Sequence, residues 1–140
     1  SLKWMLAGSI IIGVYFNAMN ILAYRFSDLY FSSKTLIYSA LFMASNMCIL
    51  EILMFQSKKS NIKLLILFGI LSLILSWMLR DQFLVNDNDW LKRMISHHST
   101  ALTTSHKIIK RTKNKKIKKL ANEIIETQEK EIKLMKKLIK

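Results

Sequence analysis

Three long apolar stretches occupy the first part of the chain and predict helices that cross a membrane. They cover about residues 4–24, 35–57 and 62–80. The first stretch carries no charged side chain, and the second carries only Glu51. A bilayer span needs about 20 mostly apolar residues. Residues 1–80 are therefore predicted to form a membrane domain of three transmembrane helices.

A second, more polar part follows a predicted linker of residues 81–89, and its apolar residues recur at helical spacing. Residues 90–140 are predicted to form two amphipathic helices joined by a short basic turn at Asn114, which is also a good helix cap. The first of these helices has three candidate caps, Asn86, Asp87 and Asn88. The predicted fold class is all-α, with three transmembrane helices followed by an antiparallel two-helix hairpin.

Composition supports this division of the chain. The 140 residues include 22 Lys and Arg against 9 Asp and Glu, no proline and 3 glycines. Most of the charge lies after residue 80, as expected for a membrane part followed by a water-exposed part. The lack of proline favours uninterrupted helices, and the single Cys48 excludes a disulfide within the chain.

The orientation in the membrane follows from the lysines and arginines in the short loops. The loop QSKKSNIK between the second and third stretches holds three lysines, whereas RFSDLYFSSK after the first holds two basic residues and one acid. This predicts a cytoplasmic N-terminus and an exoplasmic hairpin. A cleaved signal peptide is the alternative interpretation of the first stretch, but its apolar run is too long and no small-residue cleavage site follows it.

A methionine-rich stripe follows one face of the second predicted span. Its members are spaced by four, four and three residues, which places them on one side of a helix: Met43, Met47, Glu51 and Met54. One interpretation is a polarizable path for a soft cation such as Cu(I). The other is that the methionines pack between helices, while Glu51 reaches toward the lysines of the following loop.

Candidate metal ligands gather in the predicted hairpin. Met94, His97 and His98 lie within one helical turn, and folding back at the basic turn sets Met94 opposite Met135 and His98 opposite Glu131. Thioether and imidazole together suit Cu(I), whereas imidazole also suits Cu(II), zinc and nickel. Adjacent residues of a helix point about 100° apart, so the two histidines are expected to face different surroundings.

The same part of the chain resembles a known family. The runs MISHHSTALTTS and LANEIIETQEKEIKLMKKLI closely resemble the CopM-like domain of unknown function. Members of that family are small helical proteins with a ferritin-like bundle, and some are linked to copper. The membrane part resembles the subgroup with three preceding spans. Ser96 stands where the family usually has proline, and Glu51 stands where the subgroup has an apolar residue or methionine. Matching positions are Met94, Ile95, His97, His98, Ala101, Leu120, Ala121, Ile124, Ile125, Gln128, Glu131, Ile132 and Met135.

The resemblance implies a ferritin-like half-bundle that binds a soft metal ion, most simply copper, for storage, tolerance or delivery. The candidate ligands are then Met94, His97, His98 and Met135. Gln128 and Glu131 would orient an imidazole through hydrogen bonds.

A different class of function is also open, in which the chain is a non-catalytic structural or interaction protein of the membrane. Residues 107–119 hold eight basic residues and no acid, so they could contact anionic lipid or an acidic protein. They include no aromatic residue, which argues against sequence-specific binding of nucleic acid. Two amphipathic helices bury little surface, so we also expect a homodimer or a larger helical assembly.

Enzymatic activity is not expected from the sequence. The chain has no glycine-rich phosphate loop and no nucleophile spaced with a base. A ferritin-like di-iron centre needs Glu-x-x-His motifs, and the chain has none.

Overall fold

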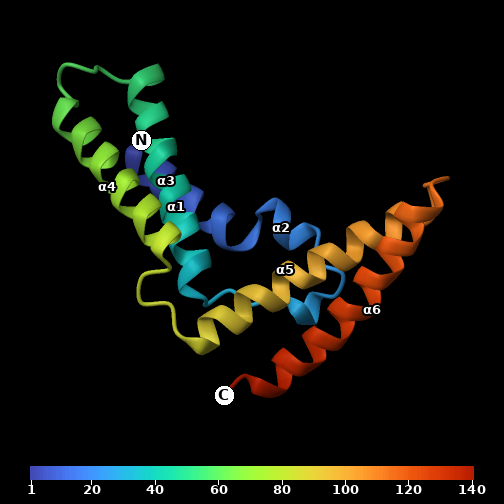
Figure 1. The fold of residues 1–140 in the computed structure, drawn as a ribbon. Coiled ribbons are helices and arrows are strands. Elements are labelled where there is room, and N and C mark those ends of the chain that lie inside the picture. Colours follow the sequence, from blue (N-terminus) through green and yellow to red (C-terminus); the bar gives the residue numbers. More distant parts are fainter. The chain divides into compact units, whose positions relative to one another are not determined.

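A computed structural model describes all of residues 1–140, and it contains helices and no strands (Figure 1). The prediction of an all-helical chain is confirmed. The elements are α1 (Leu2–Tyr15), α2 (Ala18–Ile21), the short 3₁₀ helix η1 (Phe26–Asp28), α3 (Lys34–Phe55), α4 (Ile62–Asp81), α5 (Asp87–Ile108) and α6 (Lys115–Leu138).

The chain divides into two compact units, and the division does not follow its order. The first unit holds residues 1–17 and 34–85, and the second holds 18–33 and 86–140. The sequence prediction placed residues 18–33 inside a membrane domain of residues 1–80. In the structure this segment belongs with α5 and α6 because its side chains and backbone bind to those helices.

Three helical stretches are long and apolar enough to cross a membrane, as predicted: Leu2–Ile21, Lys34–Phe55 and Ile62–Asp81. The first is interrupted, because α1 ends at Tyr15 and α2 starts at Ala18. The span predicted over residues 4–24 is therefore present as a helical stretch with a break in it. At the break the side-chain Nδ2 of Asn17 donates to the carbonyl of Gly13 at 2.8 Å, a bond that competes with regular helix geometry.

In the first unit, α3 packs between α1 and α4 through small and hydroxyl side chains. Ser45 and Ser72 are buried, and the Ser72 hydroxyl donates to the Ser45 hydroxyl at 2.9 Å, which in turn donates to the Phe68 carbonyl. Such contacts satisfy the hydrogen-bonding groups of side chains that are buried between packed helices. Gly13 of α1 meets Ala40 of α3 so closely that an added Cβ would lie 2.9 Å from the Ala40 Cα.

Replacing Gly13 with leucine is expected to separate α1 from α3, because no room exists there for a side chain. Overpacking of this kind costs roughly 1–3 kcal/mol. The thiol of Cys48 reports the change, since it is fully buried in the same unit. We expect faster maleimide labelling of Cys48 in detergent. Gly8→Leu is the matched control, because a Cβ at Gly8 meets nothing within 4 Å. Equal labelling rates in the two variants would contradict the expectation.

In the second unit, local hydrogen bonds define where α5 and α6 begin. Asn86 caps α5, because its side-chain oxygen accepts from the Asp89 backbone N–H at 2.9 Å. In the opposite direction, the Asp89 carboxylate accepts from the Asn86 backbone N–H. Asn114 caps α6 by accepting from the Lys116 and Ile117 backbone N–H groups. Of the three caps open to α5 in the sequence, the structure uses Asn86, so residues 87–89 belong to the helix rather than to the linker.

Helices α5 and α6 lie side by side and run in opposite directions (Figure 1). Asn88, near the start of α5, bonds to the backbone of Lys140 at the end of α6. The core between the helices consists of the buried side chains Leu91, Ile95, Leu102, Ile132 and Met135.

The 18–33 segment packs on α5 and α6 around a buried carboxylate. Asp28 is fully buried, and its Oδ2 accepts from the Ser99 hydroxyl at 2.6 Å, while Lys136 Nζ lies 2.5 Å from Oδ1. The backbone N–H of Tyr24 donates to the same Ser99 hydroxyl at 2.8 Å. Ser96 Oγ donates to the Asp28 carbonyl at 2.9 Å. These bonds attach the segment to both helices.

Arg25 extends this attachment at the edge of the cluster. Its guanidinium forms an ion pair with Glu129 of α6 and lies 3.7 Å from Asp28. The hydrogen bond to Glu129 is the main reason that the pKa of Arg25 rises above its ordinary value. The ring of Tyr24 stacks on His106 of α5, with 4.7 Å between the ring centroids. The segment thus contacts α5 along its length.

Candidate metal site

His98 lies at the contact between α5 and α6 and uses one of its two ring nitrogens there. Its Nε2 lies 2.6 Å from Glu131 Oε2, which is the opposition predicted by folding back at the turn. An ionised carboxylate only accepts hydrogen bonds, so Nε2 is the protonated nitrogen. The other nitrogen, Nδ1, is buried and has no hydrogen-bond partner. A neutral His98 therefore holds a buried lone pair that nothing in the chain satisfies.

A cavity of about 530 Å³ opens beside His98 between the two helices. Met94, Met135, Gln128 and Glu131 line it together with His98. Two methionines, a histidine, a glutamine and a glutamate thus line one space. Its remaining walls are apolar: Trp90, Leu91, Leu134 and Leu138.

His97 occupies a different position from His98. It is exposed and does not line the cavity, although the two rings lie 6.2 Å apart. Partial desolvation, with the nearby charges of Arg93 and His98, lowers the pKa of His97 below its ordinary value. The structure therefore brings three of the four predicted ligands, Met94, His98 and Met135, to one cavity and leaves His97 outside it.

The chemistry of this cavity depends on sulfur. No group of three or more His, Cys, Asp and Glu side chains comes together in the structure in a way that could hold a metal ion. Thioether and imidazole ligands favour soft ions such as Cu(I). The unpartnered Nδ1 of His98, with Nε2 fixed by Glu131, has the arrangement in which a carboxylate orients a ligating histidine.

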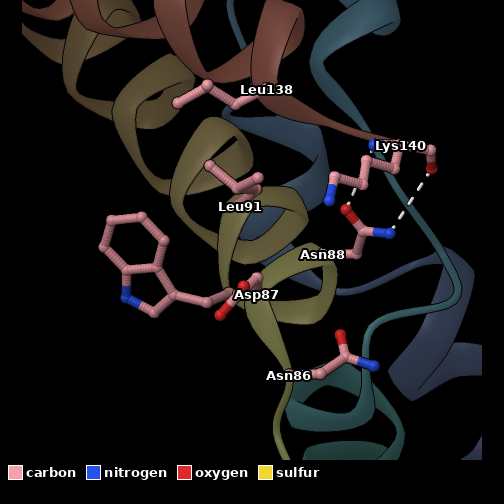
Figure 2. Close-up of a pocket in the computed structure, with 7 residues that line it drawn as sticks. Asn86, Asp87, Asn88, Leu91, Leu138 and Lys140 are labelled. Carbon is pink, nitrogen blue, oxygen red and sulfur yellow. Dashed lines mark hydrogen bonds between the residues drawn. The ribbon is translucent and has the colours of Figure 1, made fainter.

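A second and larger cavity, of about 660 Å³, lies at the ends of α5 and α6 (Figure 2). Asn88 bridges there to the backbone of Lys140, while Leu91 and Leu138 form the apolar wall. This cavity holds no histidine, cysteine or methionine. It therefore offers no soft ligand, and the smaller cavity is the better candidate for a metal site.

The methionine stripe of α3 is divided between two surroundings. The Met43 methyl faces Gly13 of α1, where an added Cβ would lie 3.0 Å away, so Met43 takes part in helix packing. Met47 and Met54 are exposed on α3, and Glu51 is half-buried. The interpretation as packing thus accounts for Met43, whereas Met47 and Met54 lie on an exposed surface of α3.

Sequence reasoning missed the residues that attach the 18–33 segment. Ser99 follows the candidate ligand His98, and Lys136 follows the candidate ligand Met135. In each pair one residue faces the cavity and the next binds Asp28. The one signal in the sequence is Asp28 itself, the only acid in the loop RFSDLYFSSK. Its partners are 71 and 108 residues away, so no local pattern reveals them.

Comparison with known proteins identifies the C-terminal part of the chain. Residues 80–139 match the family described as Domain of unknown function (DUF305). The whole chain is similar to Uncharacterized protein L153 of Acanthamoeba polyphaga mimivirus, with 31% identity over 136 residues. The similarity covers 96% of this chain and 88% of the viral protein. The chain belongs to the DUF305 family. No solved structure matches it.

The DUF305 match and the compact unit in the structure do not have the same limits. The match starts at residue 80 and includes α5 and α6, whereas the compact unit also includes residues 18–33. The DUF305 helices of this chain therefore fold with a segment that precedes them by two candidate membrane spans. The candidate metal cavity itself is lined by residues of α5 and α6 alone.

Proposed function

We propose that this DUF305 protein is an integral membrane protein whose exoplasmic helical pair binds a soft metal ion, copper, for storage, tolerance or delivery. The observation that carries the proposal is the cavity that His98 lines together with the sulfur-bearing side chains of Met94 and Met135. The Nδ1 atom of the same histidine is buried and has no hydrogen-bond partner in the chain. Copper would be held by these groups, with Glu131 fixing the imidazole and Gln128 lining the same space. The proposal involves no catalysis.

The contact between the 18–33 segment and α5 is compatible with the proposed number of membrane crossings. Two candidate spans, α3 and α4, lie between the segment and α5 in the sequence. Two crossings return a chain to the side from which it started, so both partners of the contact can lie on one side of the membrane. The basic loop between α3 and α4 favours the cytoplasm for the opposite side.

The arrangement of α5 and α6 fits half of a ferritin-like bundle, as the resemblance implies. Large apolar side chains remain exposed on this pair, among them Trp90, Leu134 and Leu138. Two pairs that meet through such side chains would form a four-helix bundle. The homodimer or larger assembly stays a prediction that rests on this exposed face.

An anaerobic Cu(I) titration of the detergent-solubilised full chain, in competition with a chromophoric chelator, tests the metal proposal. His98→Ala is expected to weaken binding because it removes the only buried imidazole. Glu131→Gln is expected to lower the affinity by roughly 10–100-fold, since it leaves the ligands but loosens the ring. Replacing Met94 and Met135 with leucine removes both sulfurs and keeps the volume of the core.

The third histidine provides a matched control for this titration. His106 stacks on Tyr24 and does not line the cavity, so His106→Ala is expected to leave the affinity for Cu(I) unchanged. His97→Ala shows whether the exposed imidazole also takes part. If the variant with both His97 and His98 changed to alanine binds Cu(I) as tightly as the natural chain, the metal proposal fails. The alternative, a structural or interaction protein of the membrane, would then stand.

A further inference from the structure

The turn between α5 and α6 carries a dense positive charge that the chain itself does not neutralise. We name residues 107–119 the basic end. All eight of its lysine and arginine residues are exposed. Only Lys119 forms an ion pair, at 3.8 Å from Glu123, and both of those side chains are well exposed to solvent. Exposed pairs of this kind contribute little, so the basic end is available to an external anion.

Aliphatic side chains are exposed in the same place as this charge. Ile117 and Leu120 are 45% and 56% exposed, and Ile108 is 41% exposed. All three border a shallow hollow of about 230 Å³ at this end of the helices. A purely electrostatic contact would not involve these aliphatic side chains. A partner that fits the basic end therefore offers both negative charge and an apolar region within reach of it.

We propose that the basic end binds the headgroup surface of an anionic phospholipid bilayer, with Ile117 and Leu120 entering its apolar margin. Such a bilayer presents many negative charges above an apolar layer, and basic amphipathic helices bind it in this way. Nucleic acid fits less well, because the basic end has no aromatic residue and has seven lysines to one arginine. Arginine and aromatic side chains are what nucleic acids engage best.

The whole length of α5 separates the basic end from the candidate spans along the chain. Helix α5 has 22 residues and is therefore about 33 Å long. Its first residue follows the third candidate span by a few residues, and the basic end is at its other end. The inference concerns a different surface from the cavity beside His98 and does not depend on metal binding.

The experiment uses the full chain in nanodiscs of phosphatidylcholine, which expose both faces of the membrane and carry no anionic lipid. Acceptor vesicles contain either phosphatidylcholine alone or phosphatidylcholine with phosphatidylglycerol, and flotation measures how much protein they carry. We expect flotation with the anionic vesicles only, and less of it as salt rises. Empty nanodiscs give the background.

Two variants at the basic end are compared with one elsewhere. Changing Lys113, Lys115 and Lys116 to glutamine is expected to weaken vesicle binding on the order of 100-fold, because each lysine near an anionic surface contributes a factor of about five. Changing Ile117 and Leu120 to serine tests the apolar contribution. The matched control changes three exposed lysines at the other end of the helical pair to glutamine: Lys133, Lys137 and Lys140.

The proposal predicts that the control variant keeps most of its binding, although it loses the same charge. Equal weakening by both sets of lysines would show that net charge alone is responsible and would overturn the proposal. It would also be overturned if the serine variant bound vesicles as well as the natural chain. The same conclusion follows if double-stranded DNA at equal phosphate concentration binds the basic end as tightly as the vesicles do. Circular dichroism confirms that each variant is helical.

Discussion

Replacing Asp28 with alanine is expected to release the 18–33 segment from α5 and α6. The substitution leaves the Lys136 ammonium without its carboxylate partner and the Ser99 hydroxyl without its acceptor. The Lys136 side chain is 32% exposed, so water can solvate its charge again, whereas the fully buried Ser99 hydroxyl keeps no acceptor, at a cost of about 1–3 kcal/mol. We expect a loss of about that size in the stability of the second unit. Hydrogen exchange of backbone amides in α5 and α6 measures it in the full chain.

A surface ion pair provides the control for Asp28. Glu126 and Lys130 of α6 lie 2.6 Å apart, and both side chains are largely exposed. Glu126→Ala is expected to leave amide exchange unchanged, since exposed pairs are screened by water. Asp28→Asn keeps the shape of the side chain, so its rate of amide exchange should lie between those of the Asp28→Ala and Glu126→Ala variants. If the backbone amides of α5 and α6 exchange at the same rate in the Asp28→Ala and Glu126→Ala variants, the buried cluster does not hold the segment in place.

Replacing Leu102 with alanine is expected to have the second large effect, through packing alone. Leu102 is fully buried between α5 and α6, within the cluster formed by Leu91, Ile95, Ile132 and Met135. Leucine-to-alanine changes in such cores cost roughly 2–5 kcal/mol, because the lost contacts add to the cost of the cavity left behind. The change in stability is measured by denaturant titration, with amide exchange of the two helices as the readout.

An exposed leucine on the same pair of helices separates packing from helix propensity. Leu120 is 56% exposed on α6, so Leu120→Ala is expected to change stability little. Equal destabilisation by Leu102→Ala and Leu120→Ala would contradict the assignment of Leu102 to the core. Asp28→Ala should not change the packing between α5 and α6 in the way that Leu102→Ala does, because Asp28 lies outside that cluster.

The elements of the chain follow closely from its local patterns. The stretches predicted over residues 35–57 and 62–80 are α3 and α4, shifted by at most two residues. The amphipathic part yields α5 and α6, with Asn114 as a cap of α6. These features depend on apolar length, periodicity and capping, all of which act within a few residues. The contact of His98 with Glu131 could also be predicted, since two regular helices joined by one short turn leave few possible registers.

The tertiary structure alone decided the features that depend on distant contacts. The burial of Asp28 and the attachment of residues 18–33 both involve residues that no periodicity connects. It also decided which of the two adjacent histidines faces the cavity, because that depends on how α5 is rotated against α6. Hydrophobic pattern determines that a helix forms and which side is apolar. A buried charge, in contrast, is stable only where its partners arrive from elsewhere in the chain.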